Sequence, residues 1–162
     1  MPAITSELPA ALTSVRTKPL FTMRLNVSAV QKIGTGQITQ QIGVIPGGSF
    51  EGERLAGEIL DGGSDWQTIR SDGSVLLDCR LVLKTTDGAM IAMTYAGIRA
   101  GAPEVLARLA KGDPVDPSEY YFRINPLFHT THPKYDWLNR VVAIGTGHRL
   151  PDGPVYSVFE LL

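Results

Sequence analysis

The segment GGSDWQTIRSDGSVLLDCR, residues 62–80, decides the fold because two extended runs in it flank one turn signal. An Asp-Gly pair between two such runs is a strong sequence signal for a two-residue hairpin turn, and this segment has one at 72–73. A second Asp-Gly pair follows at 87–88. Two hairpins of this kind predict three antiparallel strands in a fixed register, with Asp65 opposite Arg80.

This register sorts the side chains of the three strands into two faces. One face is polar and holds Asp65, Gln67, Asp78, Arg80, Tyr95 and Arg99. The other holds Trp66, Leu77, Cys79, Leu81 and Leu83. If the leucine face is the core, the polar face is an ordinary solvated exterior. If the polar face lines a small barrel, its groups form a pocket, and the leucine face packs on the helix or on another subunit. Alternation leaves both arrangements open, since one bulged residue exchanges the faces of a strand.

Turn signals recur along the whole chain, which has 17 glycines and 11 prolines among its 162 residues. Such punctuation is typical of many short strands, which we predict at 21–29, 38–45, 54–60, 65–70, 75–85, 89–99, 119–125, 138–146 and 154–161. The one expected helix is APEVLARLAKG, residues 102–112. We predict an all-β, mainly antiparallel fold that closes nine to ten strands into a barrel, with a sandwich as the alternative. Residues 1–19 are expected to be a partly ordered N-terminal arm, and 20–162 a single barrel domain.

Composition and charge narrow the classes of partner. A hydrophobic content of 43% and a charged content of 19% are typical of a globular protein. The formal net charge of -1 gives no reason to expect a nucleic acid partner. The single cysteine cannot form an internal disulfide, and no apolar run is long enough to cross a membrane. We therefore expect a cytoplasmic protein with no membrane partner.

A second stretch, EYYFRINPLFHTTHPKYDWLNR, adds candidate ligand-binding residues. Tyr121 and Arg123 alternate with apolar neighbours and so share one side of a strand. A guanidinium group can bind a carboxylate or enolate bidentately while aromatic rings stack on the rest of a ligand. The pattern favours a small aromatic or oxygenated ligand. Tyrosine is also simply common in strands.

These residues resemble domain-of-unknown-function family 3237, through IPGGSFEGERLAGEILDGGSDWQTIRSDGSVLLDCRLVLKTTDGAMI and YYFRINPLFHTTHPKYDWLNR. The resemblance implies a compact, lipocalin-like antiparallel barrel with one short helix, and it does not specify a reaction. The motif positions that it implies are Asp65, Trp66, Arg70, Asp78, Arg80, Tyr121, Arg123, Trp137 and Asn139. Leu81 stands where the family commonly has a tyrosine, and His129 where it commonly has an acidic residue.

Acid-base chemistry without a cofactor is the reaction class that these residue types favour. His129 and His132 have no spacing that favours a metal site, Cys79 lies among leucines, and no GxSxG motif is present. Candidate catalytic residues are Asp78, Arg80, Tyr95 and His129. Candidate ligand-binding residues are Asp65, Trp66, Arg70, Arg99, Tyr121, Arg123, Trp137 and Asn139. We predict a cofactor-independent lyase or isomerase acting by addition-elimination or cyclisation on an aromatic or polyketide-like compound. A carrier barrel and a homo-oligomeric structural subunit are the alternatives.

Overall fold

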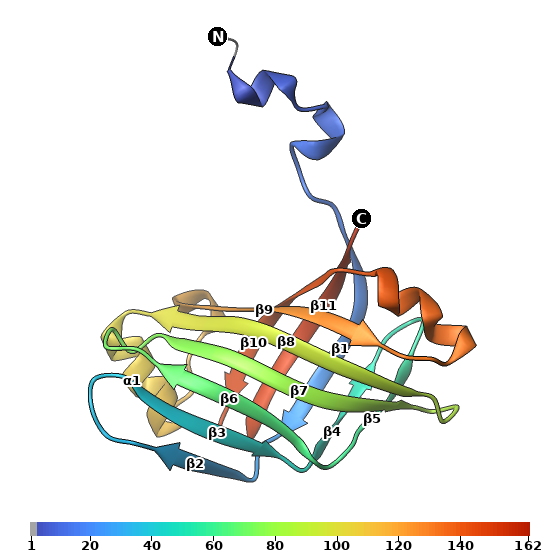
Figure 1. Ribbon diagram of the computed structural model, residues 1–162. Coiled ribbons are helices and arrows are strands. Elements are labelled where there is room, and N and C mark those ends of the chain that lie inside the picture. The colour runs from blue at the N-terminus through green and yellow to red at the C-terminus, as the bar shows by residue number, and fades with distance from the viewer. Residues whose placement is uncertain (1–2) are drawn as a thin grey trace.

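Strands of one antiparallel sheet form a barrel in the computed structural model, which describes residues 3–162 (Figure 1). Eleven strands occur in these residues: β1 (Thr17–Asn26), β2 (Ala29–Ile33), β3 (Thr39–Ile45), β4 (Gly47–Glu51), β5 (Ala56–Ile59), β6 (Gly63–Ile69), β7 (Val75–Thr85), β8 (Met90–Gly101), β9 (Tyr120–His129), β10 (Ala143–Leu150) and β11 (Gly153–Leu161). The antiparallel barrel that the sequence predicts is confirmed. The alternation of apolar and polar residues did not predict β2 and β4 as separate strands. Each of these two strands follows the preceding strand after a bend or a short loop.

Eight of these strands close on themselves in the order β7-β5-β4-β1-β11-β10-β9-β8, because β7 pairs with β8 as well as with β5. The other three strands, β6, β3 and β2, extend the sheet from the first half of β7. The outer edge of β2 pairs with no strand in residues 3–162. The sheet therefore has a free edge at β2, on the side of the barrel that we call the open end, and the mouths of β-barrels are common ligand sites.

Short helices lie at the two ends of the barrel (Figure 1). The helix α1 (Pro103–Lys111) confirms the predicted helix and ends at Gly112, whose φ of 80° is the left-handed conformation that favours glycine. It lies at the open end, with η3 (Pro117–Glu119) shortly after it in the chain. At the opposite end lies η4 (Pro133–Arg140), which occupies the first residues of the strand predicted at 138–146. No helix in the described residues is long and apolar enough to cross a membrane.

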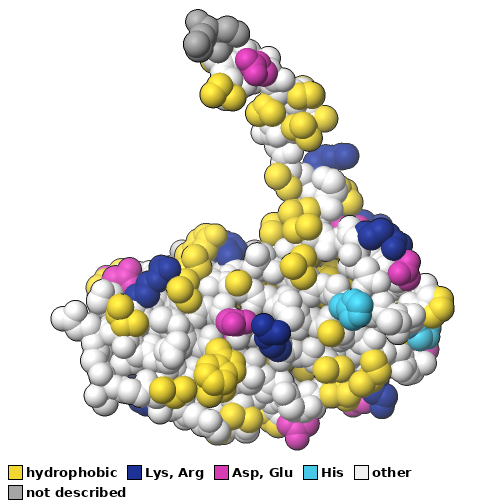
Figure 2. Space-filling view, viewed as in Figure 1, with side chains coloured by type: hydrophobic (Ala, Val, Ile, Leu, Met, Phe, Trp, Pro, Cys, Tyr) yellow, Lys and Arg dark blue, Asp and Glu magenta, His cyan; other side chains and the backbone are white. Residues whose placement is uncertain are grey.

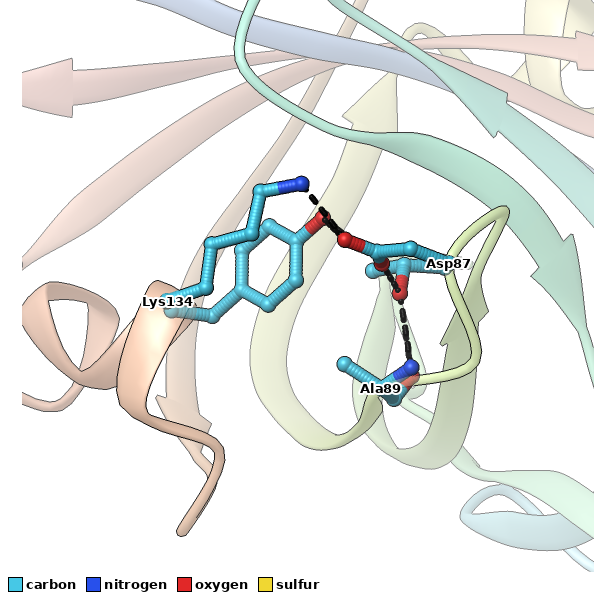
Figure 3. A network of polar contacts seen from close by, with 5 residues as sticks. Asp87, Ala89 and Lys134 are labelled. Atoms are coloured by element: carbon cyan, nitrogen blue, oxygen red, sulfur yellow. Dashed lines mark hydrogen bonds and ion pairs between the residues drawn. The ribbon is translucent and has the colours of Figure 1, made fainter.

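A network of polar contacts fastens η4 to the turn between β7 and β8 (Figure 3). The carboxylate of Asp87 accepts hydrogen bonds from the Tyr135 hydroxyl at 2.9 Å and 3.1 Å, and it pairs with the ammonium group of Lys134. The Thr85 hydroxyl donates to the same carboxylate and accepts from the backbone N–H of Ala89 at 2.9 Å. These contacts hold η4 against this end of the barrel.

The segment before β1 extends away from the barrel (Figure 1). It contains the short helices η1 (Ile4–Glu7) and η2 (Ala10–Leu12). Its larger apolar side chains are exposed, and Figure 2 shows them as hydrophobic groups along the projecting segment.

The turns that join β6, β7 and β8 contain three residues each, so the predicted two-residue turns are wrong. In the first turn the N–H of Arg70 donates to the Ser74 carbonyl at 2.8 Å, and Gly73 has a φ of 82°. The second turn, from Thr85 to Ala89, repeats the pattern, with Gly88 at 88°. A turn of this type places a left-handed glycine at its third position, in a bulge beside the strand.

The extra residue in each turn moves the register by one position. Asp65 lies opposite Cys79, and Cys79 lies opposite Tyr95. Arg80 instead faces Ser64 and Thr94, so the predicted pairing of Arg80 with Asp65 is wrong. When the register shifts by one residue, the side chains from the opposite face of a strand become the cross-strand neighbours. The shift therefore changes which side chains point together into the barrel interior.

The interior of the barrel combines the leucine face of β7 with polar residues from its neighbours. Leu77, Cys79, Leu81 and Leu83 are all buried. Asp65 and Tyr95 face inward in the same rows and are also buried. Each alternative drawn from the sequence is therefore half correct: the leucine face is the core, and part of the polar set is inside with it.

Candidate functional site

A small polar cavity lies inside the barrel towards its open end. Its volume is about 60 Å³, and its polar lining consists of Gln41, Asp65, Gln67, Tyr95, Arg99, Arg149 and Tyr156. These residues come from β3, β6, β8, β10 and β11, which lie far apart in the sequence and meet only because the sheet closes. A cavity of this size holds a few water molecules or one reacting group of a larger ligand.

Among residues 3–162, Asp65 is the one carboxyl group that lines this cavity. Its side chain is at the buried end of a chain of amide groups: Gln41 Nε2 donates to Gln67 Oε1 at 2.7 Å, and Gln67 Nε2 donates to Asp65 Oδ2 at 2.8 Å. The second oxygen, Oδ1, is buried without a hydrogen-bond partner among the described residues. Burial raises the pKa of Asp65 above its ordinary value, because an ionised carboxylate loses its hydration there.

Two tyrosine hydroxyls line the same cavity. Tyr95 on β8 and Tyr156 on β11 have their hydroxyl oxygens 3.4 Å apart. Burial raises the pKa of both phenols, so each acts as a neutral hydrogen-bond donor. The ring of Phe122 packs edge-on against Tyr156 with a centroid distance of 5.2 Å, which fixes the orientation of that phenol.

A larger hollow of about 570 Å³ lies at the open end, between β2, β3 and α1. This volume is within the range of small-molecule sites. The hollow, called the mouth below, is lined by Val30, Lys32, Gly34, Thr35, Thr39, Gln40, Gln41, Ile69, Gly73, Val75, Arg99, Leu106, Leu109, Ala110 and Arg149. Val30, Gln41, Arg99 and Arg149 line both the mouth and the inner cavity, so the two spaces adjoin at these residues.

Several residues predicted for the site lie on the outer surface instead. Trp66, Asp78, Arg80, Tyr121, Arg123 and His129 are all exposed, and Arg70 is exposed in the turn after β6. Asp78 pairs in register with Trp66 and Ala96, all three on the outward side of the sheet. Tyr121 and Arg123 border a shallow apolar groove on the same exterior, where Figure 2 shows hydrophobic side chains in patches. The structure does not bring these residues to the inner cavity.

Two other predicted residues hold η4 in place. Asn139 accepts a hydrogen bond from the Thr130 N–H at 2.9 Å and donates to the Thr130 carbonyl at 2.8 Å. The guanidinium carbon of Arg54 lies over the ring of Trp137, 4.1 Å from the ring centroid. Both lie at the end of the barrel away from the mouth, in positions that stabilise the fold.

Of the predicted site residues, the structure therefore brings together Asp65, Tyr95 and Arg99. Sequence reasoning missed Tyr156, Arg149 and Gln41 as partners of these three. Alternation indicates that Tyr156 faces one side of a strand, but no local signal tells which distant strand lies across from it. That information resides in the closure of β11 onto β1 and β10.

Cys79 lies between Asp65 and Tyr95 in the same row of the sheet. Burial raises the pKa of its thiol far above the usual value, so the thiol remains protonated and a poor nucleophile. In residues 3–162, no group of three or more His, Cys, Asp and Glu side chains is arranged to hold a metal ion.

Comparison with known proteins places the chain among a set of related barrels. A family model described as Protein of unknown function (DUF3237) matches residues 15–161. UPF0311 protein RPA1785 of Rhodopseudomonas palustris is 37% identical over 152 residues, which cover 92% of this chain and 98% of that protein. The crystal structure of a beta-barrel like protein from Acinetobacter baumannii AYE is 38% identical, covers 95% of this chain and 100% of that chain, and has a TM-score of 0.82.

One relative is named for an enzymatic activity. The hydroalkoxylation enzyme phnH of Penicillium herquei is 31% identical over 104 residues, which cover 64% of this chain and 51% of that protein. The crystal structure of an enzyme from Penicillium herquei, 22% identical with a TM-score of 0.73 over 96% of this chain and 100% of that chain, is similar in fold.

Proposed function

The chain belongs to the family Protein of unknown function (DUF3237), and from that premise we propose that it is a cofactor-independent lyase or isomerase. The reaction takes place in the inner cavity on an oxygenated, aromatic or polyketide-like compound. Its chemistry is the addition of an O–H bond across a carbon-carbon double bond, or the reverse elimination that forms the double bond. When both groups belong to one molecule, the reaction is a cyclisation.

The observation that carries this proposal is the buried carboxyl group of Asp65, one oxygen of which has no hydrogen-bond partner among the described residues. A buried carboxyl group with one oxygen unpartnered costs free energy, and a buried titratable group with a perturbed pKa in a cavity is a candidate for a functional site. The raised pKa moves Asp65 towards the range in which a group both accepts and returns a proton near neutral pH. Gln67 holds the other oxygen, so the free oxygen has a defined direction.

The addition needs no electron donor and releases no leaving group. The substrate hydroxyl oxygen forms a bond to one carbon of the double bond, and its proton passes to Asp65. Asp65 delivers one proton to the other carbon. Where the double bond is conjugated to a carbonyl group, as in a chalcone, the negative charge develops on the carbonyl oxygen, and Tyr95 and Tyr156 donate hydrogen bonds to that oxygen. The reverse sequence is an elimination that opens the ring.

The relationship to a hydroalkoxylation enzyme supports this reaction class, because hydroalkoxylation is the addition of an O–H bond across a double bond. The proposal rests on the residues of the cavity and takes from that relative only the type of bond formed.

The experiment uses 2′-hydroxychalcone, which carries a phenol and a conjugated double bond and cyclises to flavanone. The wild-type protein is expected to accelerate the cyclisation and to give one enantiomer in excess, measured by chiral chromatography. Asp65→Asn is expected to lose the acceleration and the excess. Asp78→Asn, which changes an exposed carboxylate of β7, is the matched control and is expected to behave as wild type. Equal enantiomeric excess in the Asp65 and Asp78 variants would overturn the assignment.

A carrier barrel is the second candidate, and the contrast between the two spaces favours it. The mouth is nearly ten times larger than the inner cavity, so a ligand can bind in the mouth without reaching Asp65. Chiral chromatography of the compound released after incubation with the chalcone separates the two functions, because the chalcone and the flavanone have the same mass. A carrier returns the open chalcone, and an enzyme returns flavanone.

A further inference from the structure

We propose that Arg99 and Arg149 form a site for an anionic oxygen group, a carboxylate or a phenolate, of a ligand whose apolar body lies in the mouth. This inference rests on the proposed function only in that it names the substrate class of the same site. Anion binding by the two arginines is measurable whether or not Asp65 acts on the ligand.

The guanidinium group of Arg99 lies between the mouth and the inner cavity with its charge unpaired. It forms no ion pair and no side-chain hydrogen bond with residues 3–162. Its guanidinium carbon lies over the face of the Phe122 ring, 5.5 Å from the centroid. Burial and the neighbouring positive charge of Arg149 lower the pKa of Arg99 below its ordinary value. A guanidinium group so placed has five N–H donors and needs an acceptor.

Arg149 lies on the other side of the same opening and is held by its backbone. Its N–H donates to the Tyr120 hydroxyl at 2.9 Å, and its guanidinium group donates to the carbonyl of Leu150. It too forms no ion pair with the described residues. Two like charges brought together at a cavity repel each other, and an anion between them removes that repulsion.

The charge of the mouth is positive throughout. Lys32 on β2 joins the two arginines, and no aspartate or glutamate of the described part of the chain lines the mouth. The chain as a whole has a formal net charge of -1, so this cluster is a local arrangement and does not follow from composition. A cleft lined by one sign of charge attracts ligands of the opposite sign.

Apolar side chains line part of the mouth, next to threonine and glutamine residues, and they set the body of the ligand. Val30 and Ile69 line it from the sheet, and Leu106 and Leu109 from α1. An anion with a flat or extended apolar body satisfies both parts of the lining, since the head pairs with guanidinium groups and the body packs on these side chains. Because Arg99 also lines the inner cavity, the head group lies next to the space where Asp65 is found.

The probes differ in charge and in the source of the anionic oxygen. The carboxylate is 3-phenylpropanoate, and the phenolate is 4-nitrophenol at pH 8, where it is largely ionised. The neutral control is 3-phenylpropanamide. Each compound is titrated into the full-length protein by calorimetry. Carboxylate and phenolate are expected to bind, and the amide to bind about tenfold more weakly or not at all. Whether carboxylate or phenolate binds more tightly identifies which of the two head groups the site prefers.

Arg99→Gln and Arg149→Gln are each expected to weaken binding of the preferred anion by about tenfold or more, and Arg80→Gln, an exterior arginine of β7, to leave it unchanged. Arg99→Lys keeps the charge, so partial recovery separates lost charge from lost fold, and circular dichroism checks each variant. Equal binding of acid and amide, or equal loss in the Arg80 variant, would overturn the inference.

Asp65→Asn separates this inference from the proposed function. If the variant binds the anion as wild type does but neither accelerates the cyclisation nor gives an enantiomeric excess, both stand. If wild type binds no anion while Asp65 still controls cyclisation, the anion site alone fails. If anions bind but cyclisation is unaffected by Asp65, the proposed function alone fails.

Discussion

The hydroxyl oxygens of Tyr95 and Tyr156 lie 3.4 Å apart across the barrel interior, although the two residues are 61 positions apart in the chain. Their rings are also in contact, with centroids separated by 5.7 Å. The pair joins β8 to β11 through the core and forms part of the cavity wall at the same time.

Removing either hydroxyl leaves the other buried without its partner. Tyr95→Phe and Tyr156→Phe are each expected to lower the free energy of unfolding by about 1 kcal/mol. The double variant is expected to lose less than the sum, because both partners are then gone. Urea unfolding of the four proteins measures this coupling. Strictly additive losses would show that the two hydroxyls do not interact.

Asp65→Asn is expected to stabilise the protein at neutral pH. The pKa of Asp65 is raised in the folded state above its ordinary value of 3.8, so the folded protein binds this proton more tightly than the unfolded chain. The contribution of Asp65 to stability is therefore fully present below pH 3.8 and is lost as the pH rises through the folded pKa. The variant has no such loss. Its advantage in melting temperature over wild type should grow from acid to neutral pH, and an advantage independent of pH would contradict the raised pKa.

Asp87→Asn is expected to act with the opposite pH dependence. Hydrogen bonds from Lys134, Thr85 and Tyr135 lower the pKa of Asp87 below 3.8 in the folded state. This stabilisation is present above pH 3.8 and is lost as the pH falls through the folded pKa. The variant should melt earlier than wild type at pH 7, and the difference should shrink in strong acid. Glu58→Gln, which removes an exposed ion pair with Lys84, is the control and is expected to change little.

Gly73→Ala tests the turn that sets the register. Gly73 has a φ of 82°, and an added Cβ would lie 3.2 Å from Leu106 Cδ1. The left-handed conformation costs an L-residue with a Cβ about 1 kcal/mol, so this loss is expected in denaturant unfolding. Gly73→Asn should lose less, because asparagine tolerates this conformation better. If alanine costs nothing, Gly73 does not hold the left-handed conformation.

The class of fold follows from local signals in the sequence. The glycine and proline punctuation and the clean alternation of segments such as 21–29 predict an antiparallel barrel, and the stop at Gly112 predicts the end of α1. These features depend only on neighbouring residues, which is why sequence reasoning reaches them.

The candidate site depends on one residue in a turn and on closure over long distances. Asp-Gly is compatible with both two-residue and three-residue turns, and the choice decides whether Asp65 shares a row with Arg80 or with Cys79. That single step removed Asp78 and Arg80 from the interior and left Asp65, Tyr95 and Arg99 there. Tyr156 and Arg149 reach the site through strand pairings that no local pattern encodes.

The most direct test of proton transfer by Asp65 is cyclisation of 2′-hydroxychalcone in deuterated water, with the position and stereochemistry of deuterium in the flavanone read by NMR. Delivery from one fixed carboxyl group predicts deuterium on one face of the carbon next to the carbonyl, in wild type and in Asp78→Asn. In Asp65→Asn the label is expected on both faces equally, as in the uncatalysed reaction. A single labelled face in Asp65→Asn would contradict the account.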